Sequence, residues 1–201
     1  MEINNLQDLK RASVEAGILL QKIQNYCELN DLSRTDCDEA KVRFPRGFIR
    51  TASTQKYRFP FITNAALKSN LAYTLILTDV VFWLNLRTDL SGTASEMLIK
   101  LYAFLAGAMC ESITKEYLAK ECSNIGFKPR NQYMFQNKII NQDLKDDLDW
   151  LWDTRNRMHL FQLDVGEYVN DYDIACHRRC IRAFRGLIEV LNNHSKSQAQ
   201  W

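Results

Sequence analysis

Arg155 and His159 are the two residues whose types and spacing are most suited to catalysis in this chain. At positions i and i+4 of a helix, two side chains share a face with Cβ atoms about 6 Å apart. Arginine grips a phosphate through paired hydrogen bonds, and histidine exchanges a proton near neutral pH. Asn156 adds an amide that can orient either group. Such a set is chemically suited to metal-free RNA cleavage, in which one group assists the ribose 2′-hydroxyl and another neutralises charge on the phosphorane.

The segment that carries these residues is expected to be a helix over 143–161. Arg155 lies in the middle of its apolar stripe, where a guanidinium is costly unless something pairs with it. One interpretation is an anionic ligand such as phosphate. The other is a buried arginine paired with a carboxylate of a neighbouring helix, for which Glu111 is the obvious candidate, together with a core histidine. Glu111 can also support the site by orienting Arg155 or His159. The apolar stripe consists of Leu144, Leu148, Leu151 and Met158.

A second candidate region is the segment 41–61, which holds six basic residues and no acidic one. Basic groups interleaved with aromatic side chains are how single-stranded RNA is held without strong sequence preference. The alternative is that the aromatic side chains pin the segment to the protein while its charges face water, and the two interpretations are compatible. The candidate RNA-binding residues are Arg43, Arg46, Arg50, Lys56 and Arg58, and the aromatic residues among them are Phe44, Phe48, Tyr57 and Phe59.

Metal and cofactor sites are not expected. Cys176 and Cys180 flank His177, but this spacing is not that of a zinc finger or ribbon, and no second cysteine pair lies near them in the sequence. Glycine-rich phosphate loops, paired catalytic acids and nucleophile elbows are also missing from the sequence. The six cysteines are expected to be reduced, because a chain of 201 residues with 46% hydrophobic residues does not need disulfides for stability.

The pattern of apolar residues predicts an all-α fold. We expect a bundle of four to five long helices forming one domain over 1–201, with the segment 41–61 as an irregular loop or hairpin inserted between the first two helices. Low glycine and proline contents, 7 and 3 residues, agree with long helices. The first expected helix covers 6–29, and the second is capped by Thr63 or Asn64 and runs to about 85–87. The others cover 96–122, 131–141, 143–161 and 174–191, and 131–141 is the short one.

Charge and hydropathy favour a cytoplasmic protein without a membrane span. The formal net charge of +2 is nearly balanced, so nucleic-acid binding must come from a local patch. The longest apolar run in the first half, 71–86, is interrupted by polar residues and is shorter than the about 20 residues a span needs. The first residues also lack the basic and apolar regions of a signal peptide.

The segment from Leu144 to Leu160 resembles the signature helix of the HEPN superfamily (higher eukaryotes and prokaryotes nucleotide-binding). In that family an arginine is followed by a polar residue and then, a few positions later, by a histidine. Arg155, Asn156 and His159 match these three positions, and the resemblance covers about the last third of the chain. It implies a helical bundle that dimerises, with two signature helices facing each other across a shared cleft.

The resemblance also implies a function, with alternatives that the sequence leaves open. Many HEPN proteins are metal-independent ribonucleases in toxin–antitoxin or antiviral systems, whereas others only bind or dimerise. The expected partners are therefore RNA, a second copy of the chain, and an antitoxin or other protein regulator. The family spacer is usually longer than the three residues that separate Arg155 from His159. A π-bulge, an early helix end, or Arg157 acting on the phosphate can compensate for this difference.

Overall fold

The computed structural model describes residues 2–122, 124–158 and 172–198, and within them it contains helices and no strand. The expectation of an all-α protein is therefore confirmed for the described part of the chain. The chain falls into two compact units, Met1–Arg46 and Gly47–Trp201. Each unit is described by itself below.

The first unit is built on one long helix. Helix α1 (Leu6–Leu29) begins at Asn5, whose side-chain oxygen accepts a hydrogen bond from the Asp8 backbone N–H. After α1 the chain turns back through Asp31, which has a positive φ of 58°, and forms the short 3-10 helix η1 (Asp38–Ala40). Cys27 is the one hydrophobic side chain of this unit that is buried among the described residues.

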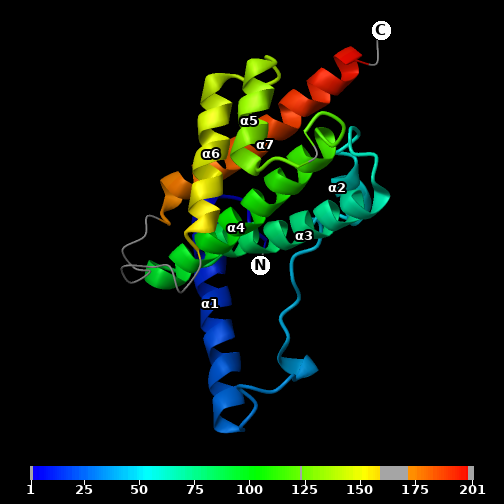
Figure 1. The fold of residues 1–201 in the computed structure, drawn as a ribbon. Helices are drawn as coiled ribbons and strands as arrows, with labels where there is room; N and C mark the ends of the chain where they lie inside the picture. Colours follow the sequence, from blue (N-terminus) through cyan, green and yellow to red (C-terminus); the bar gives the residue numbers. More distant parts are fainter. Residues whose placement is uncertain (1, 123, 159–171, 199–201) are drawn as a thin grey trace. The chain divides into compact units, whose positions relative to one another are not determined.

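The second unit is organised around helix α4 (Gly92–Tyr117), which contacts four other helices: α3 (Ala65–Arg87), α5 (Phe127–Gln136), α6 (Gln142–Asn156) and α7 (Ile174–Gln198). Helix α6 also packs against α5, beside which it lies in Figure 1, and against α7. The buried face of α4 is rich in small residues, which lets its neighbours approach closely. Its buried residues are Ile99, Ala103, Ala106, Gly107, Met109, Cys110, Ile113 and Thr114.

Several helix boundaries differ from the sequence-based expectation. Helix α5 begins at Phe127, so Pro129 lies within its first turn, where the backbone N–H that proline lacks has no helical partner in any case. Helix α4 begins at Gly92 and ends at Tyr117, earlier at both ends than expected. Helix α7 continues to Gln198, well beyond the expected end at Leu191. Of the two candidate caps Thr63 and Asn64, it is Asn64 that caps α3, by accepting from the Leu67 N–H.

The segment 41–61 spans the boundary between the two units and contains a helix that the sequence analysis did not predict. Helix α2 (Ala52–Lys56) is capped by Thr51 and packs against α3. Neither its residues nor those around it form a hairpin. Phe59 is fully buried and Phe48 stacks on Phe82 of α3 with ring centroids 6.4 Å apart. The aromatic side chains therefore do attach the part of the segment after Arg46 to the helices.

Helices α3 and α4 are long and apolar enough to cross a membrane by length and composition alone. The sequence analysis expected no membrane span because the apolar run 71–86 has only 16 residues. Helix α3 extends beyond this run at both ends and has 23 residues. Both helices also contribute buried side chains to the second unit, including Leu75 and Ile113. Core helices of this kind meet the same criterion as membrane spans.

Candidate functional site

Arg155 lies in the last turn of α6 and faces α4, as the stripe pattern predicts. The stripe residues Leu148 and Leu151 are fully buried. The arginine fits because α4 has no side chain at Gly107: a Cβ atom there would lie 3.0 Å from the Arg155 Cβ and 3.1 Å from its Cγ. Gly107 therefore opens a channel along which the arginine side chain runs over α4.

The guanidinium of Arg155 reaches Glu111, one helical turn beyond Gly107. The Nη2 to Oε2 distance is 3.7 Å, which is within ion-pair range but longer than a hydrogen bond. The Arg155 side chain is 26% exposed and that of Glu111 is 36% exposed. The arginine is thus paired within its own chain, as one of the two interpretations holds, but the pair is loose and open to solvent.

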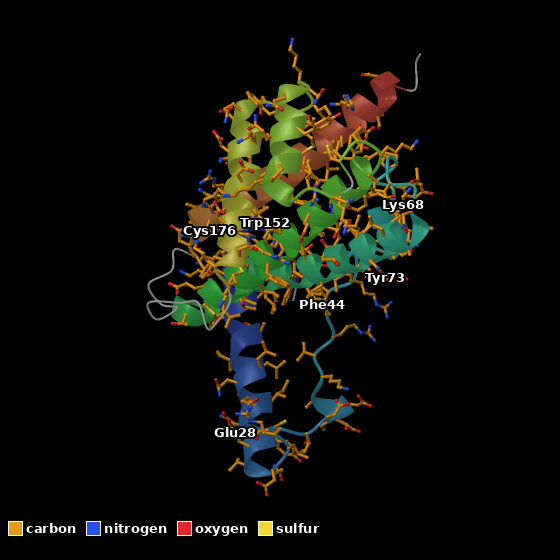
Figure 2. The ribbon with its side chains drawn as sticks, in the orientation of Figure 1. Glu28, Phe44, Lys68, Tyr73, Trp152 and Cys176 are labelled. Carbon is orange, nitrogen blue, oxygen red and sulfur yellow. The ribbon has the colours of Figure 1, made fainter. Side chains whose placement is uncertain are left out.

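Two aromatic rings flank the same guanidinium. Its Cζ lies 5.1 Å from the Trp152 ring centroid and 5.7 Å from that of Phe104 on α4. Trp152, labelled in Figure 2, stacks in turn on Phe127 with centroids 5.0 Å apart. Cation–π contacts orient the guanidinium without using its N–H donors, which leaves those donors for another acceptor.

The donors of Arg155 are only partly used. Nη1 donates to the Asn156 side-chain oxygen at 3.1 Å, whereas Nε is buried and has no hydrogen-bond partner among the described residues. A buried unpaired donor costs about 1–3 kcal/mol, and native proteins rarely leave one without a reason. The buried Nε is out of reach of solvent, so an anion can bind only at the outer, partly exposed end of the guanidinium.

Helix α6 ends at Asn156, earlier than the expected end at Phe161. Arg157 follows as the helix cap and is exposed, and Met158 lies in a turn and is half-buried. His159 lies outside the described residues. Because the helix stops before it, the spacing of a regular helix does not determine the relative geometry of Arg155 and His159. An early helix end is one of the ways in which the short spacer of the motif can be accommodated.

A second arginine near Glu111 was missed by the sequence analysis. Arg130 of α5 is buried and donates to the Ile125 backbone oxygen at 2.6 Å, to the Thr114 hydroxyl at 3.3 Å and to the Glu111 backbone oxygen at 3.5 Å. Burial lowers the pKa of Arg130, and the nearby Glu111 charge raises it in part. The sequence pattern could not predict that Arg130 is buried, because its hydrogen-bond acceptors lie in the preceding loop and on another helix.

The candidate RNA-binding residues of the segment 41–61 have different environments. Arg43 and Arg46 are exposed in the first unit, and Lys56 is half-buried in the second. Arg50 instead pairs with the buried carboxylate of Asp79 on α3. Arg58 lies over the Phe184 ring of α7 at 5.6 Å, and burial, followed by repulsion from Arg50, lowers its pKa.

The described residues contain no group of three histidine, cysteine or acidic side chains that could hold a metal ion. All six cysteines are free thiols, and Cys176 and Cys180 lie buried on α7. Burial raises the pKa of Cys110 and also contributes, after a hydrogen bond with Cys176, to the raised pKa of Cys180. These thiols are therefore protonated near neutral pH and are poor nucleophiles.

Comparisons with known proteins assign no family to this arrangement. No family model matches the chain, and no curated protein or solved structure matches it. The argument for function therefore depends on the site itself.

Proposed function

We propose that this protein is a metal-independent endoribonuclease of the HEPN type, acting in defence or as a toxin. Arg155 holds the scissile phosphate, Asn156 orients the guanidinium or the RNA, and His159 is the general acid/base. The observation that carries this proposal is the state of Arg155. Its guanidinium faces inward, yet it remains partly exposed, is 3.7 Å from its carboxylate partner and has an unpaired Nε.

A phosphate can replace Glu111 at this arginine. Direct charge-assisted hydrogen bonds to a phosphate are about 2.7–2.9 Å long and can be bidentate, so they are stronger than the present contact. The exposed Phe104 ring and the half-buried Trp152 ring lie beside the guanidinium and supply surfaces for base stacking. RNA presents both groups at once, an anionic backbone and flat bases.

The reaction needs no metal or oxidant. The ribose 2′-oxygen attacks the adjacent phosphorus while a base removes its proton, and the P–O5′ bond breaks as the 5′-oxygen gains a proton. The products are a 2′,3′-cyclic phosphate and a 5′-hydroxyl. Arg155 neutralises the charge that develops on the non-bridging oxygens, and His159 is the group that transfers protons. Arg157 is a supporting cation for the RNA backbone.

The proposal extends to assembly and location. The helices of the second unit form a HEPN-type bundle, and two copies of α6 face one cleft in a homodimer. An antitoxin or another protein regulator restrains the activity in the cytoplasm. Arg43, Arg46 and Lys56 are the members of the basic segment whose described environments leave them suited to contact RNA; Arg50 and Arg58 have structural partners.

The second candidate is a non-catalytic module that binds RNA or a nucleotide, or only dimerises. Two observations favour it: Arg155 has a partner in its own chain, and α6 ends before His159. In this case Arg155 still holds a phosphate, but no proton transfer follows.

Incubating the purified protein with mixed RNA in EDTA separates the two candidates. We expect the wild type to produce 5′-hydroxyl ends, and both Arg155→Ala and His159→Ala to lower the rate by about 100-fold or more. Arg87→Ala, at an exposed arginine at the end of α3, is the matched control and should cleave normally. Intact RNA that still binds in an Arg155-dependent way identifies the non-catalytic module. Intact and unbound RNA, or cleavage that both variants retain, overturns the proposal.

A further inference from the structure

Helix α1 has an exposed apolar face that its own unit does not cover. Leu9, Leu19 and Leu20 are 47%, 59% and 51% exposed, and Cys27 is the one hydrophobic side chain of residues 2–46 that is buried. Figure 2 shows the side chains that project from this helix along its length to Glu28. Soluble proteins rarely leave a continuous apolar stripe of this kind open unless it forms an interface.

Six residues of α1 form a stripe with a heptad pattern, whereas Val14 and Ile18, which are also exposed, lie away from it on the helix. Counted every seven residues, Leu9, Ala16 and Ile23 occupy one core position, and the residues three places after each, Ala12, Leu19 and Tyr26, occupy the other. This is the spacing at which one helix packs side by side with a second helix. A helix of 24 residues is about 36 Å long and offers six such positions.

The C-terminal end of the stripe contains a cavity that an apolar side chain can fill. The chain returning after α1 lies over this end and leaves a space of about 270 Å³. Leu32, Cys37 and Ala40 form the returning side, and the helix contributes Ile23, Tyr26 and Cys27. Lys22 and Glu39 also line the space, but most of its lining is apolar, so a leucine side chain is a better occupant than water or an ion.

We propose that α1 pairs in an antiparallel way with α1 of a second copy of the chain. In this register Ala16 packs opposite the partner subunit's Leu19, and Leu9 packs opposite the partner subunit's Tyr26. Each Leu9 therefore enters the apolar cavity of the other copy, and the two-fold symmetry fills both cavities.

Charge complementarity selects this orientation. Glu15 and Lys22 are exposed on the same edge of the stripe, seven residues apart. In the antiparallel register each Glu15 lies beside the partner subunit's Lys22, which gives two ion pairs in the dimer. In a parallel pair the same edge of one helix faces Leu20 and Cys27 of the other, so neither charge gains a partner. This interface is separate from the Arg155 site and does not depend on the proposed ribonuclease activity.

Charge reversal in the full chain tests the proposal. We expect the wild type to have a mass of about 47 kDa by light scattering, twice the 23.5 kDa of one chain. Glu15→Lys alone and Lys22→Glu alone each place like charges together and should weaken dimerisation about 10-fold or more. The double variant restores both pairs, and a mixture of the two single variants restores them as a heterodimer. Recovery on mixing cannot occur if α1 docks within its own chain.

Leu9→Lys tests the cavity contact. It places a charge in the apolar space and should weaken the dimer more than either charge variant does, leaving only the α6 contact of the proposed function, whereas Val14→Lys changes an exposed residue on the other side of α1 and should leave the mass unchanged. A monomeric wild type at concentrations of about 100 μM, or single charge variants that dimerise like the wild type, overturns the proposal. A dimer that is lost in Arg155→Ala and unaffected by all α1 variants also overturns it, because the interface then lies at α6.

Discussion

Two inward-facing ion pairs of the second unit differ in how completely they are satisfied. The Asp79 carboxylate, 4% exposed, accepts from the Arg50 backbone N–H at 3.1 Å, from its guanidinium at 2.5 and 3.2 Å, and from the Gln55 amide at 3.0 Å. The Arg155 guanidinium is 3.7 Å from Glu111 and retains an unpaired donor. Both pairs join α3 or α4 to another part of the chain.

The difference separates a structural pair from a candidate functional one. The hydrogen bonds that the Arg50 guanidinium donates to Asp79 raise the pKa of Arg50, as expected for a tight ion pair. The pair anchors the segment before α2 to α3 and leaves little capacity for a ligand. The looser contact of Arg155 can be exchanged for a phosphate at small cost. Whether an inward-facing arginine marks a binding site therefore depends on how many of its hydrogen bonds are already made within the protein.

The largest expected effect is the loss of stability when the Arg50–Asp79 ion pair is broken. Asp79→Asn removes the charge that holds Arg50 and disturbs the buried Gln55 amide. A broken buried pair costs about 3–5 kcal/mol, and because the Arg50 side chain is 48% exposed we expect about 2–3 kcal/mol less stability in urea unfolding. The control Asp153→Asn breaks the exposed pair with Lys128 and should cost less than about 1 kcal/mol. Equal losses in the two variants would contradict the structural role of Asp79.

An intermediate effect is expected where α4 makes room for Arg155. In Gly107→Ala the new methyl group meets the arginine at 3.0 Å, so the side chain must shift. Overpacking costs about 1–3 kcal/mol and the gain in helix propensity returns about 1, so unfolding should show a net loss of about 0–2 kcal/mol. RNA affinity should fall at the same time. The same change at Gly17, which has nothing within 4 Å, should stabilise the protein by about 0.5–1 kcal/mol. Unchanged RNA affinity in Gly107→Ala would show that Arg155 is not the phosphate ligand.

The smallest expected effect is the change in RNA affinity when the Arg155–Glu111 ion pair is removed. Glu111→Gln removes the competing negative charge, and we expect RNA to bind about 3–10-fold more tightly because the phosphate no longer displaces a carboxylate. Stability should change by less than about 1 kcal/mol, since both side chains are partly exposed. Fluorescence anisotropy with a short labelled RNA at two salt concentrations measures the first effect. Weaker binding in Glu111→Gln would instead mean that Glu111 positions Arg155 for the RNA.

Much of the local structure was predictable because it depends on neighbours in the sequence. The apolar period predicted α1 over its observed limits and the buried stripe of α6, and the cap candidates Thr63 and Asn64 marked the start of α3 to within one residue. The ends of helices were less predictable. Leu118 and the residues after it have the composition of a helix, but the last helical turn of α4 stops at Tyr117, and no strong local signal marks that point.

The site was predictable in part. The position of Arg155 on an apolar stripe indicated that it faces inward, and Glu111 was the expected carboxylate. The role of Arg130 and the tight binding of Arg50 to Asp79 were not indicated, because residues far apart in the sequence make these contacts. The channel at Gly107 was also missed: a glycine in a helix does not by itself show which side chain it admits.

The amino-acid sequence by itself determined that the described chain is helical, which face of α6 turns inward, and that a charge lies on that face. Only the tertiary structure decided which charges are neutralised: Asp79 closes on Arg50 and Gln55, whereas Glu111 leaves Arg155 partly free. The physical reason is that periodicity follows from the geometry of one helix, while the satisfaction of a charge depends on donors and acceptors brought together by packing.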